Sequence, residues 1–254
     1  MILKKEIQNK SIEWKVPPDT VDKDWVLGHF LGAMFTVKKH KENLVFKGGT
    51  ALRKCYFENY RFSEDLDFTA IDRNYIISLS EIEEIIRKVT ELSGILFHID
   101  NYRLLKFENK TTGYQFRLKY WGADHSKNQE PPDVERWSTG IKIEIILYEE
   151  MAFKPVKNKI IHPYSDSSGF SDIEVPCYDL KEIMAEKLRA LIQRSYTAPR
   201  DFYDIYSLND HIEVGDWKEI RSAFIQKTRF KGYDPESIET IFNKATLRSV
   251  KNAW

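Results

Sequence analysis

The sequence predicts an α+β protein, with a mixed α/β domain over residues 1–175 and a helical bundle over residues 176–254. Two observations lead to this division. Strand-like and helix-like runs interleave before Pro176, whereas only amphipathic helical runs follow it. The chain has 254 residues, of which 42% are hydrophobic and 31% charged, so it can bury the core of one large domain or two small ones.

The first helix is expected over residues 19–40, where Val26, Phe30, Met34 and Val37 recur at helical spacing. After it come an apolar strand that ends at two glycines, a second helix, and a strand in which apolar and acidic residues alternate. We expect these three elements over residues 44–49, 50–59 and 61–70.

The clearest helix is predicted over residues 78–94, because Ser80 and Glu83 match a capping box and Gly94 can end the helix. Three more strands and a polar loop with prolines are then expected before Pro176. The strands are predicted over 95–109, 114–122 and 141–149, and the loop over 123–140. The amphipathic helices after Pro176 are predicted over 178–195, 199–210, 216–230 and 235–254.

The overall charge indicates no global preference for nucleic acid or for a membrane. The formal net charge is +0 and the pI is about 7.0, so an RNA partner would have to use a local basic surface. The most apolar segment, residues 25–37, is too short to span a bilayer, and the N-terminus lacks the apolar run of a signal peptide. These features predict a cytoplasmic protein.

The cysteines and histidines show no metal-ligand spacing. Cys55 and Cys177 lie far apart in the sequence, as expected for reduced, partly buried thiols of a cytoplasmic protein. The six histidines are scattered, and His98, His125 and His162 are expected at the surface.

Two carboxylates stand out in the strand predicted over residues 61–70. Asp65 and Asp67 are two residues apart, so both point to one face of that strand. Carboxylates this close repel each other, and when desolvated they must share a proton or hold a cation. A hard divalent ion such as Mg²⁺, or Mn²⁺ in its place, suits such oxygen ligands. The alternative is a solvated strand face that carries two acids.

Gly48, Gly49 and Thr50 stand between a predicted strand and a predicted helix. Glycine permits positive φ and the close approach of a ligand, and the start of the helix offers free N–H groups to an anion. With the hydroxyl of Thr50, this segment can hold phosphates ahead of the two carboxylates, as metal-dependent nucleotidyl transfer requires. A plain turn is the alternative. The sequence contains neither a P-loop nor a zincin pattern.

Three further side chains are candidates for the same site. Glu144 points away from the apolar face of its predicted strand, so it can supply a third metal ligand or a base. Arg53 lies one turn inside the helix after the glycines and can pair with phosphate or with Asp67. Ser63 precedes the carboxylates and can contact the triphosphate. For Glu144 the alternative is an exposed strand residue, and for Ser63 it is a residue that ends a turn.

Four motifs together resemble those of the AbiEii/AbiGii toxin family of nucleotidyltransferases, within the polymerase-β-like superfamily. The first is the double glycine followed by Asp65 and Asp67, and the second is KIEI with Glu144, where many members have aspartate. The third is a lysine followed seven residues later by an arginine, and the fourth is PRDFYDIYSL. The residues concerned are Lys187 and Arg194 in the third motif and Arg200, Asp201, Asp204 and Leu208 in the fourth.

This resemblance implies a nucleotidyltransferase fold, with a mixed sheet flanked by helices and a C-terminal helical domain. It also implies an NTP substrate used with Mg²⁺. Members of the family are toxins of bacterial toxin–antitoxin and phage-defence systems, and some add nucleotides to the 3′ end of tRNA. The partners that it implies are therefore an RNA acceptor and a cognate antitoxin.

The two cations of the third motif lie on the first helix predicted after Pro176. Lys187 and Arg194 are two turns apart on nearly the same side, so together they can clamp the phosphates of a nucleotide. Asp204 can orient Lys187 through an ion pair, whereas Asp201 is expected only to open the next helix. A solvent-facing basic stripe is the alternative for the two cations.

The sequence evidence for the acceptor is weaker than that for the nucleotide site. Residues 216–254 carry eight Lys and Arg against five Asp and Glu, with Phe230 and Tyr233 among the cations, as in surfaces that stack on RNA. A solvated helix surface is the alternative. The leading hypothesis is a nucleotidyltransferase that acts on RNA, with a small molecule or a protein side chain as the alternative acceptor. The alternative outside the enzymes is a non-catalytic module that binds nucleotide or antitoxin.

Overall fold

The structure is a computed structural model that describes residues 2–123, 125, 130–170, 172–194 and 196–252. These residues form two compact units. The first lies within residues 1–149 and 157–177, and the second within residues 150–156 and 178–254. A division into two domains after residue 175 stays a prediction.

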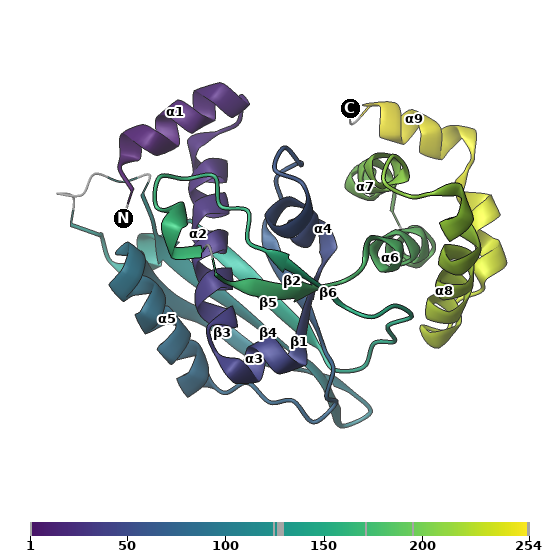
Figure 1. Cartoon of the computed structure of the whole chain (residues 1–254), viewed down its shortest axis with the longest axis horizontal. Helices are drawn as coiled ribbons and strands as arrows, with labels where there is room; N and C mark the ends of the chain where they lie inside the picture. Colours follow the sequence, from purple (N-terminus) through teal and green to yellow (C-terminus); the bar gives the residue numbers. More distant parts are fainter. Residues whose placement is uncertain (1, 124, 126–129, 171, 195, 253–254) are drawn as a thin grey trace. The chain divides into compact units, whose positions relative to one another are not determined.

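A seven-stranded sheet runs through the first unit in the order β3-β4-β5-β2-β1-β7-β6 (Figure 1). β2 pairs with β5 and β1 with β7 in parallel, whereas β1–β2, β3–β4 and β4–β5 are antiparallel. The predicted mixed sheet is thus confirmed. Its strands are β1 Leu44–Lys47, β2 Asp65–Ala70, β3 Leu96–Phe107, β4 Lys110–Trp121, β5 Gly140–Ile146, β6 Val156–Lys159 and β7 Glu174–Cys177.

Two long helices, α2 Pro18–Phe35 and α5 Leu79–Ser93, pack side by side against one face of this sheet (Figure 1). α2 is buried along most of its length, because α1 Lys4–Trp14, α5 and β5 all contact it. The short helices of the unit are α3 Lys38–Asn43 and α4 Gly48–Ala51, which continues as a π-helical turn over Leu52–Tyr56.

The central strands follow the alternation expected from the sequence. Ile143 and Ile145 of β5 are buried, and so are Leu66 and Phe68 of β2, which face the same core. Burial of each such side chain stabilises the fold by roughly 1.5–3 kcal/mol. Because a shift of one residue would turn these side chains out of the core, their burial sets the register between β2 and β5.

The N-terminal cap of α5 lies two residues earlier than expected from the sequence. The capping box is formed by Ser78 and Glu81, not by Ser80 and Glu83. With Ser78 as the cap, the flanking residues Ile77 and Ile82 are both buried in the core, as a hydrophobic staple requires. Gly94 ends the helix as predicted, with φ of 75° and its N–H donated to the carbonyl of Thr90.

Other boundaries also differ. The helix predicted over 19–40 is divided into α2 and α3, and the strand predicted over 61–70 begins only at Asp65. α1, β6 and β7 were not predicted from the sequence. The two missed strands have four residues each, VKNK and EVPC, which is too short for a visible alternation.

The second unit contains the helices that the sequence predicts after Pro176, and a helical C-terminal part is thus confirmed. α6 contacts both α7 and α8. The helix predicted over 235–254 is interrupted, because the Asn243 side chain accepts N–H groups from Ala245 and Thr246 and begins a new helix there. The elements are α6 Leu180–Gln193, α7 Pro199–Asn209, α8 Trp217–Phe230 and α9 Lys244–Asn252, with 3₁₀ turns at Val214–Asp216 and Pro235–Ile241.

A buried ion pair ties residues 150–156 to these helices. Lys227 Nζ lies 2.6 Å from Glu182 Oε1, and both side chains are almost fully buried. The other oxygen of Glu182 accepts the main-chain N–H groups of Ala152 and Phe153, each at 2.8 Å. Because the charges are paired and hydrogen-bonded, their burial is tolerated.

None of the described helices is long and apolar enough to cross a membrane. Cys55 and Cys177 are free thiols, as predicted, and both are buried.

The expectation for the histidines is wrong for His162, which is only 5% exposed. Its ring packs on Phe170, with 4.1 Å between the ring centroids, and the sequence around it shows no helical or strand period that would reveal this. His98 is exposed as expected, whereas His125 is half-buried and stacked on Trp121.

A pH dependence of stability follows from a further buried histidine, His40. Burial lowers the pKa of His40 to about 4, against the opposing effect of Glu81, so the folded protein keeps this ring neutral where the unfolded chain protonates it. Stability should therefore fall from about pH 6.5 towards pH 4, by on the order of 2 kcal/mol for this residue. Urea unfolding measured across this range should show a shallower pH dependence for His40→Gln than for the unmodified protein. Equal slopes for the two proteins would contradict this assignment.

Candidate active site

The parallel pairing of β2 with β5 brings three acidic side chains together. Asp67 lies opposite Glu144 in the register, and Asp65 lies opposite Lys142. Because the residues between them face the core, Asp65, Asp67 and Glu144 all lie on the other face of the sheet. All three acids are half-buried.

Burial, together with the neighbouring charges, changes the acidity of the two aspartates. Burial raises the pKa of Asp67 to about 6; Lys47 lowers it, and Glu144 and Asp65 raise it further. Burial likewise raises the pKa of Asp65, and Lys142 opposes this shift. The charged forms are therefore destabilised, as expected where neighbouring carboxylates repel each other in a desolvated position.

Glu144 is held from two sides. Gln115 Nε2 donates to its Oε2 at 2.6 Å, and Lys142 Nζ lies 3.2 Å from the same oxygen. The donor set of Asp65, Asp67 and Glu144 consists of carboxylate oxygens, which suits Mg²⁺ or Mn²⁺. The carboxylate oxygens of these three acids lie farther apart than another group of ligand atoms among the described residues. That group is His29, His162 and Asp166, whose ligand atoms lie within 4.8 Å of one another.

The double glycine lies directly against these acids. Gly48 has a φ of 78°, and a Cβ placed there would come within 3.0 Å of Asp67 Oδ2. A Cβ on Gly49 would come within 2.7 Å of Arg61 Nη2 and 3.2 Å of Ser63 Oγ. The turn, Asp67 and Ser63 are thus neighbours, as expected from the sequence.

Thr50 and Arg53 make internal contacts. The Thr50 hydroxyl donates to the main-chain oxygen of Asp65 and ties α4 to β2. Arg53 is 5% exposed, and its Nε donates to Asp24 Oδ1 at 2.7 Å while its Nη1 donates to the carbonyl of Tyr60. This corrects the expectation that Arg53 pairs with phosphate or with Asp67, because its guanidinium is buried and already paired with α2.

Lys47 was not expected from the sequence to belong to this site. A lysine at the end of a strand is usually solvated, but Lys47 is 8% exposed and lies opposite Asp67 in the β1–β2 register. Its Nζ is 3.8 Å from Glu149 Oε2. Lys47 therefore places a positive charge beside the acids. Its position immediately before the glycines, on an otherwise apolar strand, was the available signal.

In the second unit, the cations of the third motif pair with the acids of the fourth. Lys187 Nζ lies 2.7 Å from Asp204 Oδ2 and 2.9 Å from Asp201 Oδ1, and Arg194 Nε lies 2.6 Å from Asp201 Oδ2. Burial alone would lower the pKa of Lys187, but Asp204 and Asp201 outweigh it and raise the pKa. Asp201, expected only to open a helix, thus bridges both cations, which sequence spacing alone does not reveal.

A pocket of about 410 Å³ opens beside Asp65 within the first unit. Four cationic side chains line it, together with the acids Glu64 and Asp65 and the polar side chains of Asn101 and Gln115. The cations are Lys23, Arg103, Arg117 and Lys142.

A family model described as nucleotidyl transferase AbiEii toxin, type IV toxin–antitoxin system, matches residues 29–254. Among solved structures, the chain is similar to MenT4, a nucleotidyltransferase toxin of Mycobacterium tuberculosis H37Rv, with a TM-score of 0.61 and 22% identity over 90% of this chain and 70% of that chain. JHP933 of Helicobacter pylori matches with a TM-score of 0.47 and 15% identity, over 92% of this chain and 94% of that chain. None of the curated proteins matches.

The contact between Gly48 and Asp67 yields a matched pair of variants. Gly48→Ala adds a Cβ at positive φ against Asp67, whereas Gly232→Ala adds one at a φ of 79° with no atom within 4 Å. Both should lose on the order of 1 kcal/mol of stability. Only Gly48→Ala should also lose nucleotidyl transfer, by about 100-fold, because it displaces a carboxylate of the site. Thermal unfolding and transfer rates measure both effects, and equal activities of the two variants would refute the placement of the turn in the site.

Proposed function

The chain belongs to the AbiEii family of nucleotidyltransferase toxins of type IV toxin–antitoxin systems. On this premise, we propose that it transfers NMP from an NTP to a hydroxyl of RNA, with the 3′ end of tRNA as the leading acceptor. The observation that carries the proposal is the alignment of Asp65, Asp67 and Glu144 on adjacent strands beside the glycine turn. A cognate antitoxin as partner and a cytoplasmic location belong to the same proposal.

Asp65, Asp67 and Glu144 are the residues that would hold Mg²⁺ or Mn²⁺. Such an ion, when bound, neutralises charge on the phosphates and lowers the pKa of the attacking hydroxyl. The raised pKa of Asp67 supports this role, because a carboxylate that is destabilised as a lone anion gains most from a cation. Gly48 and Gly49 leave space for phosphate oxygens next to Asp67.

In the proposed transfer, the acceptor oxygen forms a bond to the α-phosphorus while the bond from that phosphorus to the bridging oxygen of the β-phosphate breaks, so pyrophosphate leaves. The hydroxyl proton goes to a carboxylate of the site, and Glu144 is our assignment. The amide of Gln115, which donates to Glu144 Oε2, would keep this carboxylate in place.

Lys187 and Arg194 are proposed to balance the negative charge of the triphosphate. Asp201 and Asp204 hold Lys187 in its charged form, as its raised pKa indicates. Arg194 is more accessible, with 39% of its side chain exposed, and its guanidinium can turn from Asp201 to a phosphate. We therefore assign orientation to the two acids and phosphate contact to the two cations.

For the acceptor, the pocket beside Asp65 supports RNA. Its four cations can contact backbone phosphates, and its amide side chains can hydrogen-bond to sugar or base. Phe230 and Tyr233 in the second unit, each 38% exposed, are candidates for stacking on bases. The four cations outnumber the two acids of the lining, Glu64 and Asp65, which favours a negatively charged acceptor over a neutral one.

The test incubates the protein with each α-³²P-labelled NTP in turn, with Mg²⁺ and total RNA. We expect label at the 3′ end of tRNA. Asp67→Asn should lower the rate by about 100- to 1,000-fold, because it removes a charge used in the transition state. Asp72→Asn is the control, since Asp72 is exposed and lies just beyond the same strand.

The outcomes separate the alternatives. Label in protein or in a small molecule would replace the proposed RNA acceptor. Nucleotide binding without any labelled product would favour the non-catalytic module. Unchanged transfer by Asp67→Asn would refute the assignment of the carboxylates.

A further inference from the structure

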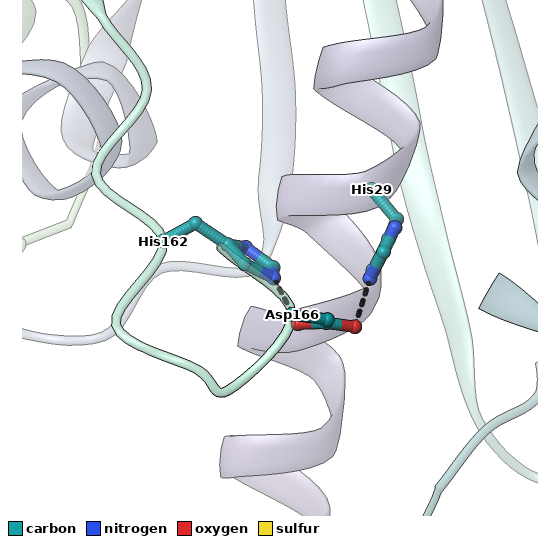
Figure 2. A group of neighbouring side chains, drawn as sticks. All are labelled: His29, His162 and Asp166. Carbon is teal, nitrogen blue, oxygen red and sulfur yellow. Dashed lines mark hydrogen bonds and ion pairs between the residues drawn. The ribbon is translucent and has the colours of Figure 1, made fainter. Parts of the chain in front are cut away.

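Three side chains that the proposed transfer does not use meet in the first unit (Figure 2). His29 comes from α2, and His162 and Asp166 come from the segment that precedes the 3₁₀ turn Ser167–Phe170. His29 Nε2 lies 2.9 Å from Asp166 Oδ2, and His162 Nε2 lies 3.1 Å from Asp166 Oδ1. Two imidazoles thus point the same ring nitrogen at the two oxygens of one carboxylate (Figure 2).

These separations suit a metal centre. The three ligand atoms all lie within 4.8 Å of one another. In a four-coordinate zinc site, with bonds of about 2.0–2.2 Å, neighbouring ligand atoms are roughly 3.4 Å apart. The two nitrogen–oxygen distances of 2.9 and 3.1 Å are close to that value, so small shifts would admit an ion.

The surroundings orient the ligands. Trp25 Nε1 donates to Asp166 Oδ2 at 3.0 Å, the kind of outer contact that positions a ligating carboxylate. A Cβ on Gly28 would lie 2.3 Å from His162 Nδ1, so glycine at this point of α2 lets the ring approach the helix. His162 Nδ1 has no hydrogen-bond partner among the described residues. Nε2 carries the proton that is donated to Asp166, and this proton can move to the unpartnered Nδ1, which leaves Nε2 available as a ligand.

The cluster is shielded on one side and open on the other. His29 is 8% and His162 5% exposed, whereas 28% of the Asp166 side chain is exposed. A pocket of about 490 Å³ reaches His29 and Asp166 and is otherwise lined largely by apolar side chains, including Val89, Leu92 and Phe170. It supplies an entry path for an ion and room for a further ligand.

We propose that His29, His162 and Asp166 bind a divalent transition ion, with Zn²⁺ as its representative, and leave one coordination position facing this pocket. Two imidazole nitrogens and one carboxylate oxygen select zinc-like ions over Mg²⁺, which prefers oxygen alone. The site is therefore chemically distinct from the carboxylates of β2 and β5. The ion would fasten the segment around Asp166 to α2, over 130 residues away in the chain.

The first experiment treats the purified full chain carrying Asp67→Asn with a chelator and titrates it with Zn²⁺ by calorimetry and with Co²⁺ by visible absorption. We expect one Zn²⁺ per chain, the visible bands of four-coordinate Co²⁺, and a rise in Tm of about 5 °C in excess Zn²⁺. His162→Gln, added to that chain, should weaken binding by at least about 100-fold, since it removes a ligand itself. His98→Gln, at an exposed position on β3, is the control and should bind as before.

A second measurement covers the case in which His162→Gln does not fold. X-ray absorption on the zinc-loaded chain with all histidines present should show two imidazole ligands. Absence of Zn²⁺ binding would overturn the proposal and leave a hydrogen-bonded cluster only. An all-oxygen ligand set, or equal weakening by His98→Gln and His162→Gln, would also overturn it.

Discussion

The register between β2 and β5 is the constraint on which the rest of the site depends. Burial of Leu66, Phe68, Ile143 and Ile145 on one face of the sheet excludes a shift of either strand by one residue. The same alignment places Asp65, Asp67 and Glu144 together on the other face. The apolar core therefore stabilises an arrangement of like charges that would not assemble by itself. Burial first, and then the neighbouring acids Glu144 and Asp65, raise the pKa of Asp67.

The neighbouring elements make this arrangement usable. Asp24 on α2 pairs with both Arg53 and Lys54, and all three side chains are almost fully buried. This network fixes the π-helical turn that follows the glycines, so Gly48 is held against Asp67. Because one buried acid serves two cations, removal of Asp24 would leave two charges unpaired, and such networks are costly to break.

Much of this could be predicted from the sequence, because it depends on local periods. The alternation of apolar and acidic residues in the β2 and β5 segments predicted which acids share a face of the sheet. The change at Pro176, from interleaved strand-like and helix-like runs to helical runs alone, predicted the helical second part. The partners of long side chains could not be predicted in this way. Arg53 pairs with Asp24, and His162 meets His29, through contacts between residues 29 and 133 positions apart, which no local pattern encodes. The cap of α5 was missed by two residues, since both Ser-x-x-Glu frames match and only burial of the flanking isoleucines distinguishes them.

We propose that the carboxylates on β2 and β5 hold the metal and that the glycine turn holds the phosphates. The most direct measurement is a crystal structure with Mn²⁺ and a non-hydrolysable NTP, with Mn²⁺ located by its anomalous scattering. We expect Mn²⁺ bound by Asp65 and Asp67, with Glu144 nearby and the triphosphate against Gly48 and Gly49. Nucleotide and Mn²⁺ bound elsewhere on the chain, with these carboxylates making no metal contact, would contradict it.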